Sequence, residues 1–379
     1  MLDRTSWSRG RFWVRAGVCA TAMLALAAVG VTSTASAGAS AGPKKSNITI
    51  AFAQGYCGNT WRAAMNSAFF TEAKLLEKQG QLASYKYVCA NGSVATQESQ
   101  IATLIIDHPS VIIIDPQSTT ALNGVIARAH AAGIPVLDTE SGPVTSPIPY
   151  ELNEDNWGNM YLAGQYIAQR LHGVGNVFED RGQPGYTNET VFHYGLLAAL
   201  KPYPKIHVIA SVWGAWDDAT SEAKTAAVLS GLPTINAIAG QGGTYGVLEA
   251  FKAAGRPVPV VTGDNRGTFL HWWAAESKTN PSFTTVSIEV NPGIGAAAAW
   301  VAVQIAKGTK VPKTMVMPVL TITQSTLSQY ENTPVTTTAS HIYPASWFQK
   351  NLLAAAPTNN GQGPGCTGDK SATSANGCK

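Results

Sequence analysis

Ten polar and aromatic residues stand where the sequence predicts that strands end and helices begin. They are Asn59, Trp61, Asp138, Thr139, Glu140, Asn188, Trp216, Gln241, Asp264 and Glu289. Carboxylates and amides can each bind two neighbouring hydroxyl groups, and a tryptophan offers a large face to an apolar surface. Every hydroxyl that a pocket buries needs a hydrogen-bonding partner. These residue types together predict a pocket for a small polyhydroxylated ligand.

Several of these residues also have a purely structural interpretation. Asp138 and Asp264 each follow a strand, where an aspartate commonly caps a helix. Trp61 and Trp216 have the size and apolarity of core residues, but their place in loops before helices favours exposure to a ligand. Because aspartates appear at matching strand ends in both halves of the chain, the pattern favours ligand contacts over capping.

Alternating strand and helix signals must position these residues. The expected strands are 48–52, 85–88, 111–114, 134–137, 176–179, 207–211, 235–239, 258–261 and 285–288. The expected helices are 60–76, 95–106, 121–132, 160–171, 190–200, 219–229, 245–254, 269–275 and 294–305. This alternation predicts an α/β fold of two Rossmann-like lobes, each with a parallel sheet and right-handed crossovers. Ligands of such sheets lie beyond the carboxyl ends of the strands.

The first 37 residues have the pattern of an exported protein. A basic start with four arginines precedes an apolar run at 16–31, and Ala35-Ser36-Ala37 fits a cleavage site. The pattern predicts a signal peptide over 1–37 and a leader linker over 38–46. A retained membrane anchor, the alternative, would need a longer and more apolar run. We therefore expect the mature protein in the periplasm or otherwise outside the cytoplasm.

Charge and motifs exclude several classes of protein. Residues 1–37 hold four Arg and one Asp, so 22 basic and 22 acidic residues remain beyond them. A neutral chain without a run of Lys or Arg is not typical of a nucleic-acid binder. No Gly-x-Ser-x-Gly elbow stands between an expected strand and helix, no Gly-x-Gly-x-x-Gly follows the first expected strand, and no metal-ligand cluster is found, so we expect no enzyme, metal or cofactor. A glycosidase built on Asp138, Glu140 and Asp264 is the enzymatic alternative.

Four cysteines lie beyond residue 37, namely Cys57, Cys89, Cys366 and Cys378. An even number in an oxidising compartment predicts disulfides, and three pairings are possible. The pairing of Cys57 with Cys89 is favoured because both follow neighbouring predicted strands at one end of a sheet. Cys366 and Cys378 would close a small loop in the tail 351–379, whose composition predicts flexibility. A metal site is the competing interpretation, but no Cys-x-x-Cys or matching histidine spacing supports it.

Runs 87–101, 111–116 and 131–138 carry the most specific signal in the chain. They resemble the ribose- and xylose-type periplasmic sugar-binding proteins, which are type I, cluster B solute-binding proteins of ABC transporters. The resemblance extends in order over roughly residues 47–325. It implies a lobe of 47–149 plus 291–318, a second lobe of 150–290 plus 319–350, and a hinge of three crossing segments. It also implies sugar contacts at Asn59, Trp61, Asp138, Trp216, Asp264 and Glu289.

The expected pocket departs from that of the ribose binders. Thr139 stands where those proteins place an Arg, and a second Arg expected in the helix after Asn188 is also missing. We therefore expect a pocket without these two guanidinium groups, with Glu140 and Glu289 as added acceptors. Arg266 is the one nearby guanidinium that could substitute. Such a pocket fits another pentose or hexose, a polyol, or a cationic ligand.

The resemblance implies a monomer that closes two lobes over its ligand and delivers it to an ABC-transporter permease. Its hinges are expected near 149–153, 290–292 and 318–323. A ligand-binding partner of a chemoreceptor or sensor kinase with the same fold is the alternative function. Neither nucleic acid nor stable membrane insertion is expected.

Overall fold

The computed structural model describes residues 46–140 and 142–354. The predicted signal peptide and the tail with Cys366 and Cys378 lie outside the described residues, so the predictions about them stay predictions. Within the described part of the chain, no helix is long and apolar enough to cross a membrane.

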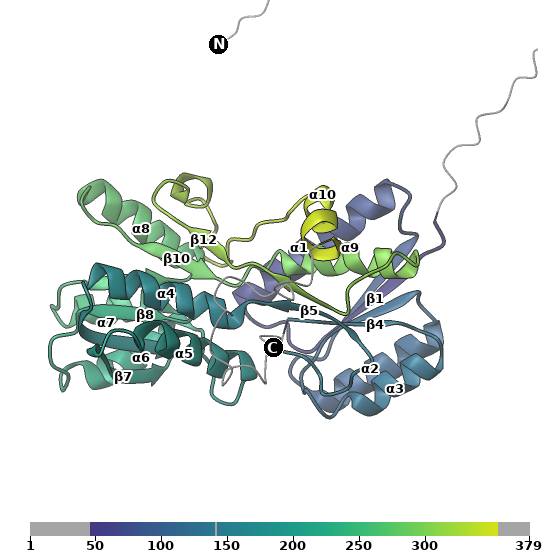
Figure 1. The fold of residues 1–379 in the computed structure, drawn as a ribbon, viewed down its shortest axis with the longest axis horizontal. Helices are drawn as coiled ribbons and strands as arrows, with labels where there is room; N and C mark the ends of the chain where they lie inside the picture. The colour runs from purple at the N-terminus through teal and green to yellow at the C-terminus, as the bar shows by residue number, and fades with distance from the viewer. Residues whose placement is uncertain (1–45, 141, 355–379) are drawn as a thin grey trace, which may run out of the picture. The chain divides into compact units, whose positions relative to one another are not determined.

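The first lobe is built on a parallel sheet of order β11-β5-β4-β3-β1-β2 (Figure 1). Its strands are β1 (Thr49–Gln54), β2 (Ser84–Cys89), β3 (Val111–Asp115), β4 (Val136–Thr139), β5 (Tyr150–Glu154) and β11 (Thr314–Met317). Its helices are α1 (Thr60–Lys78), α2 (Val94–Asp107), α3 (Asn123–Ala131), α9 (Ile294–Ala306) and α10 (Ala345–Phe348). Side chains alternate across the sheet. Phe52 and Ile113 pack with α1 and α9, whereas Ala53 and Ile112 pack with α2 and α3.

The second lobe is built on a sheet of order β12-β10-β9-β8-β6-β7, in which only β12 runs antiparallel to its neighbour. Its strands are β6 (Val174–Arg181), β7 (Lys205–Trp213), β8 (Ala237–Gly240), β9 (Val260–Gly263), β10 (Val286–Glu289) and β12 (Leu320–Ile322). Its helices are α4 (Asn156–Arg170), α5 (Thr187–Leu200), α6 (Asp218–Leu229), α7 (Thr244–Ala253) and α8 (Gly267–Thr279). Val177 packs with α4 and α5, and Phe178 packs with α6, α7 and α8.

The predicted fold class of two α/β lobes is confirmed. Each of the nine expected strands corresponds to one of β1–β4 or β6–β10. The three remaining strands were not expected, for a physical reason. β5 reads Tyr-Glu-Leu-Asn-Glu and lacks the apolar run of a buried strand, and β11 and β12 are only four and three residues long.

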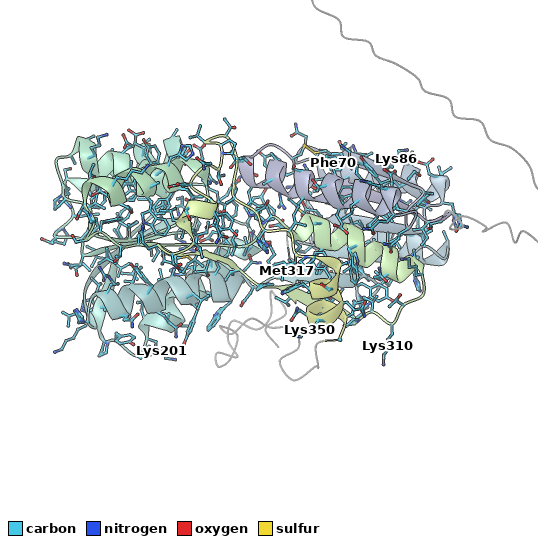
Figure 2. The ribbon with its side chains drawn as sticks, turned by 90° about the horizontal axis from the view of Figure 1, so that it is seen from above. Phe70, Lys86, Lys201, Lys310, Met317 and Lys350 are labelled. Atoms are coloured by element: carbon cyan, nitrogen blue, oxygen red, sulfur yellow. A yellow bond between two sulfur atoms is a disulfide. The ribbon has the colours of Figure 1, made fainter. Side chains whose placement is uncertain are left out.

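The chain passes between the sheets at three expected places and one unexpected place. The first passage follows Glu154, because β5 pairs with β4 and β11 in the first sheet rather than starting the second lobe at residue 150. The second is 290–293, between β10 and α9. The third is 318–319, directly after Met317, which is labelled in Figure 2. These lie at or within a few residues of the expected hinges.

The fourth passage is formed by residues 339–344, which return from the second lobe to the first. The amide N–H of Ala339 bonds to the carbonyl of Asn265 in the second lobe, 2.8 Å away. The next elements are α10 and a π-helical turn, η2 (Gln349–Leu353), which contains Lys350 of Figure 2. Phe348 is fully buried, and its ring lies 5.6 Å from that of Trp300 in α9. Residues 345–353 thus pack on the first lobe, whereas the expected bounds divided them between the second lobe (319–350) and the tail (351–379).

Candidate functional site

A pocket with about 470 Å³ of empty volume lies where the carboxyl ends of both sheets meet. Its walls are Asn59, Trp61, Arg62, Glu140, Asn188, Phe192, Trp216, Gln241, Arg266, Glu289 and Val290. The first lobe supplies the start of α1 and the residue after β4. The second lobe supplies α5 and the loops that follow β7, β8, β9 and β10. Parallel strands place their carboxyl ends at one edge, so segments far apart in sequence converge here.

Seven of the ten predicted site residues line this pocket, and Asp138, Thr139 and Asp264 do not. Asp138 is buried, and its Oδ2 accepts a hydrogen bond of 2.8 Å from the amide of Val144. Thr139 is also fully buried. A ligand contact by these three residues is therefore not supported by their positions, and ligand binding by the other seven stays a prediction.

Asp264 caps a helix, as the structural interpretation of the sequence allowed, but the helix is α7 and not the one that follows Asp264. Its Oδ2 accepts hydrogen bonds from the amides of Gly243 (2.8 Å) and Thr244 (3.0 Å) at the start of α7. Its Oδ1 accepts one of 3.1 Å from the amide of Arg266. The carboxylate thus caps the helix that precedes its own strand, which only the pairing of neighbouring strands could reveal.

Two guanidinium groups line the pocket, that of Arg266, which was the expected substitute, and that of Arg62, which was not expected. Arg62 comes from the first turn of α1, directly after Trp61, and Arg266 comes from the loop after β9. They occupy positions other than those in the ribose binders. The sequence signal for Arg62 was its place in the loop-to-helix run that also holds Asn59. The sequence did not mark Phe192 and Val290 as pocket residues, because an apolar side chain in a helix or after a strand is equally expected in the core.

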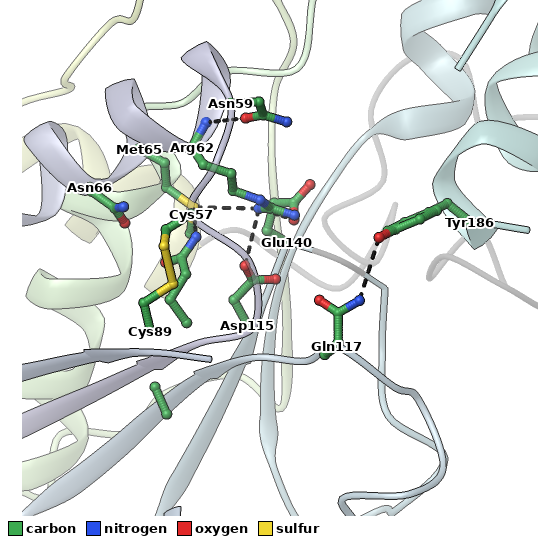
Figure 3. Close-up of polar contacts among 12 residues, drawn as sticks. Cys57, Asn59, Arg62, Met65, Asn66, Cys89, Asp115, Gln117, Glu140 and Tyr186 are labelled. Atoms are coloured by element: carbon green, nitrogen blue, oxygen red, sulfur yellow. Dashed lines mark hydrogen bonds and ion pairs between the residues drawn. A yellow bond between two sulfur atoms is a disulfide. The ribbon is translucent and has the colours of Figure 1, made fainter. Parts of the chain in front are cut away.

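Arg62 is the centre of a buried charged cluster in the first lobe (Figure 3). Its Nη1 lies 3.2 Å from Oδ2 of Asp115 and also pairs with Glu140. Burial opposes the charge, but Asp115 and Glu140 outweigh it and raise the pKa of the guanidinium above its ordinary value. Asn59 caps α1 by accepting a 2.8 Å hydrogen bond from the Arg62 amide, which leaves its side-chain NH₂ as a donor.

Glu289 is the corresponding carboxyl group of the second lobe. Its Oε2 accepts a 2.8 Å hydrogen bond from the amide of Asn265, and its Oε1 has no partner among the described residues. Burial, and then the charge of Asp264, raises the pKa of Glu289 to about 8, although Arg266 opposes the shift. The group therefore holds a proton at neutral pH and can donate as well as accept a hydrogen bond. Arg266 itself donates to the carbonyl of Trp216.

Glycines make room for the indole of Trp216. A Cβ atom on Gly182 would lie 2.1 Å from the indole, and one on Gly242 would lie 2.9 Å from it. The ring of Tyr186 meets the indole edge-on at 5.7 Å. On the other side of the pocket, the indole N–H of Trp61 donates to the carbonyl of Val290 over 3.1 Å, which fixes that ring.

Both walls of the pocket contain residues with left-handed backbones. Glu140 has a φ of 70°, and the successive residues Ala215 and Trp216 each have a φ of 57°. Such conformations cost residues other than glycine about 1–3 kcal/mol each and concentrate at functional sites. Here they bring Glu140 and Trp216 to the pocket from opposite lobes.

Gln241 is oriented by the carboxylate of Glu179, a residue with no sequence signal for a place in the site. Its Oε1 accepts a 2.9 Å hydrogen bond from the Gly182 amide, and its Nε2 donates to Glu179 over 3.3 Å. Glu179 is fully buried and also contacts Nδ1 of His193 (2.9 Å) and the hydroxyl of Ser211 (3.0 Å). Ser211 donates to the carboxylate and not to the histidine, which is not the arrangement of an activated nucleophile.

The predicted disulfide between Cys57 and Cys89 is confirmed. It connects the β1–α1 loop, which carries Asn59, to the end of β2 (Figure 3). In the ranges 46–140 and 142–354, no group of three His, Cys, Asp or Glu side chains is placed to hold a metal ion.

Comparison with known proteins identifies relatives over most of the chain. The family profile described as "Periplasmic binding protein domain" matches residues 50–310. A protein named "Xylitol-binding protein" from Mycolicibacterium smegmatis is 29% identical over 237 residues, which are 61% of this chain and 67% of that protein. "Ribose import binding protein RbsB" from Bacillus subtilis is 25% identical over 269 residues, 69% of this chain and 85% of that protein.

The fold is also found in a solved structure of a similar protein. An ABC transporter solute binding protein from Thermobispora bispora superposes with a TM-score of 0.71 at 30% identity. The match covers 80% of this chain and 94% of that one.

Proposed function

This chain belongs to the periplasmic binding protein family, and we propose that it is the extracytoplasmic solute-binding protein of an ABC importer that takes up a monosaccharide or polyol. The names of its relatives, which refer to xylitol and ribose, support a ligand of this class. We further propose that the predicted signal peptide is cleaved, that the mature protein is a monomer, and that its partner is an ABC-transporter permease.

The pocket supports this proposal because its side chains can bond the hydroxyl groups of a polyol and pack against its apolar faces. Amide donors are supplied by Asn59, Asn188 and Gln241, and carboxyl groups by Glu140 and Glu289. Trp61 and Trp216 provide apolar faces from opposite lobes, and Arg62 and Arg266 add charged donors. Because the walls come from both lobes, a ligand contacts the second lobe fully only when the lobes are close. It therefore stabilises the closed state over the open one.

We propose a binding role without catalysis. The glycosidase alternative required Asp138, Glu140 and Asp264 to face one ligand, but only Glu140 lines the pocket. A retaining or inverting glycosidase needs two carboxyl groups flanking the scissile bond. Glu140 pairs with Arg62 and Glu289 comes from the other lobe, so each fits a hydroxyl-binding role.

A polyol or sugar with an amino group is a second candidate ligand. The observation that favours it is the Oε1 of the buried Glu289, which has no partner among the described residues, together with a second carboxyl group, that of Glu140, in the wall of the same pocket. An ammonium group within reach of Glu289 would favour its ionised form, so binding would release a proton. A neutral polyol would leave Glu289 protonated.

A thermal-shift screen of the mature protein tests the proposal, with pentoses, hexoses, pentitols, inositols and their amino derivatives as probes. Binding to the folded state raises the melting temperature. We expect at least one sugar or polyol to do so. If no probe does, while unrelated solutes such as amino acids do, the assignment of a sugar is wrong.

A matched pair of tryptophan variants locates the site. Trp216→Ala removes a wall of the pocket and should abolish the shift. Trp213 lies three residues before Trp216 and outside the pocket, and its half-exposed ring packs under Arg181. Trp213→Ala should therefore keep the shift.

A further inference from the structure

A second, larger compartment, partly open to solvent, lies beside the pocket. It has about 960 Å³ of empty volume and shares Asn59, Arg62, Asn188, Trp216 and Arg266 with the inner pocket. The residues that it does not share include Tyr56, Pro116, Gln117, Gln183, Tyr186 and Asp217. Because five side chains border both spaces, one ligand can extend from the inner pocket into this outer compartment.

The two compartments differ in chemistry. The inner pocket has Glu140 and Glu289, both buried, among its walls. The outer compartment adds amides and phenols, which both donate and accept hydrogen bonds, and the carboxylate of Asp217, while Arg62 and Arg266 border both spaces. Nε2 of Gln117 in the first lobe lies 3.4 Å from the hydroxyl of Tyr186 in the second (Figure 3). The amides and phenols can donate to and accept from the hydroxyls of a second unit.

The first-lobe wall of the outer compartment is fixed by buried contacts. Gln97 is fully buried; its Nε2 donates to the carbonyl of Asp115 (2.7 Å), and its Oε1 accepts from the amide of Gln117 (2.9 Å). A Cβ atom on Gly58 would lie 2.6 Å from the hydroxyl of Tyr56, so that phenol lies directly against the glycine. The neighbouring disulfide at Cys57 restrains the same loop.

The second-lobe wall is also built from constrained residues. Ala215 and Trp216 both have left-handed backbones, and the ring of Tyr186 meets that of Trp216 edge-on. Asp217 caps α6 by accepting a 2.9 Å hydrogen bond from the Thr220 amide, which holds the loop. Two constrained walls with aromatic rings and amides are the features of a preformed binding site.

We infer that the ligand has two units, with one sugar or polyol unit in the inner pocket and a glycosidically linked second ring in the outer compartment. A monosaccharide would occupy only the smaller of the two spaces and would leave the phenols and amides of the larger one in contact with water. The inference rests on the proposed function: it keeps the sugar or polyol unit in the inner pocket and extends the ligand to a disaccharide or a glycosylated polyol.

The test compares matched pairs of probes by calorimetry on the mature protein. The pairs are D-xylose and xylobiose, D-glucose and cellobiose, and myo-inositol and its galactoside. We expect the longer member of at least one pair to bind tenfold or more tightly than the shorter. If the shorter member of every pair that binds is equal or tighter, the inference is wrong while the proposed function stands. If neither member of any pair binds, the sugar assignment itself fails.

Variants show whether the outer compartment causes the difference in affinity between the longer and the shorter ligand. Tyr186→Ala should weaken the longer ligand at least fivefold more than the shorter, and Gln117→Ala should act in the same direction. Tyr194→Ala removes a half-exposed phenol of the same helix that lines neither compartment, and both affinities should stay within twofold. Equal losses for both ligands in Tyr186→Ala would mean that the Gln117–Tyr186 contact serves lobe closure, which would overturn the inference.

Discussion

Glu289 and Gln241 line the same pocket but are held by the protein in different ways. Glu289 has one oxygen bound to the Asn265 amide and one without a partner among the described residues, whereas both ends of the Gln241 amide are bound, by Gly182 and Glu179. The first residue can therefore change its protonation state, and the second has a fixed orientation. The remaining N–H of the Gln241 amide is left to bind a ligand oxygen.

The raised pKa of Glu289 predicts a pH dependence of stability. The folded protein holds this proton up to about pH 8, but the unfolded chain releases it near 4.5. The free energy of unfolding should therefore fall as the pH rises through this interval, by up to about 1.4 kcal/mol per pH unit. Glu289→Gln should remove this contribution and should be the more stable protein at pH 8.

Urea denaturation at pH 5, 6, 7 and 8 measures the effect as the difference in the free energy of unfolding between the wild type and Glu289→Gln. Other buried carboxyl groups add slopes of the same sign, but they cancel in that difference. Glu222→Gln, on the exposed face of α6, should reproduce the wild-type slope. Parallel curves for wild type and Glu289→Gln would show that the group is ionised throughout.

Glu179 should act as a positioning residue for Gln241. Glu179→Gln replaces an obligate acceptor by an amide that can also present a donor to Nε2 of Gln241, so the orientation of Gln241 is no longer fixed. Loss of one hydrogen bond of about 1–1.5 kcal/mol should lower ligand affinity about fivefold to tenfold. Calorimetry with a sugar or polyol from the screen measures the affinity.

Ser211→Ala is the control, because it removes another partner of Glu179 outside the pocket, and it should change the affinity less than twofold. A loss of affinity in Ser211→Ala equal to that in Glu179→Gln would argue against a positioning role.

At the scale of elements, the pocket depends on loops that the core does not hold by itself. The loop after β1 is fixed by the disulfide and by Asn59 at the start of α1. The loop after β7 is fixed by Arg266 and by close contact of Trp216 with two glycines. Each loop thus relies on bonds to a segment distant in sequence, as a binding site on a rigid scaffold requires.

Removal of the Cys57–Cys89 disulfide should weaken both stability and binding. The bridge spans 32 residues, and closing such a loop stabilises the folded state by about 3–4 kcal/mol in the chain-entropy account. The double variant Cys57→Ser/Cys89→Ser should lose about this much in urea denaturation and should bind its ligand more weakly, because Asn59 lies on the released loop.

The double variant is preferable to a reducing agent, because a reducing agent would also break the predicted disulfide between Cys366 and Cys378. Adding a reducing agent to the double variant is the control and should change its stability little. A double variant with the stability and affinity of the wild type would show that the loop is held by its other contacts alone.

At the scale of the whole molecule, four passages within residues 46–140 and 142–354 connect the lobes. The fourth is bonded to the second, since Oδ1 of Asn291 accepts from the His341 amide (2.9 Å) and Nδ2 of Asn291 donates to the His341 carbonyl (2.8 Å). The hydroxyl of Thr60, at the start of α1, also lies 3.4 Å from that of Thr338. The C-terminal segment thus contacts both lobes and a hinge between them.

Phe348 should hold this segment on the first lobe. Its fully buried side chain packs on Trp300, so Phe348→Ala should lower the free energy of unfolding by about 3–5 kcal/mol. Urea denaturation measures the loss. Ser346→Ala, an exposed position of the same helix, should cost less than 1 kcal/mol. A similarly small cost for Phe348→Ala would mean that the segment contributes little to the folded lobe.

The sequence by itself determined the fold class, because runs such as 111–114 are continuous and β-branched and alternate with amphipathic helices. It also determined most of the pocket, since residues after parallel strands converge whatever the details of packing. It could not identify β5, whose polar residues are buried only because neighbouring strands and passages cover them. The pairing of strands had to be known before Asp264 could be assigned to the cap of α7.

Only the tertiary structure decided which groups face the ligand space. Asp138 and Glu140 are two residues apart, yet one is bonded to Val144 inside the lobe and the other reaches the pocket through a left-handed backbone. Arg62 and Glu179 owe their roles to partners on other strands and helices. Sequence periodicity reports which face of an element is apolar. The direction of a loop side chain depends on long-range contacts that no local pattern encodes.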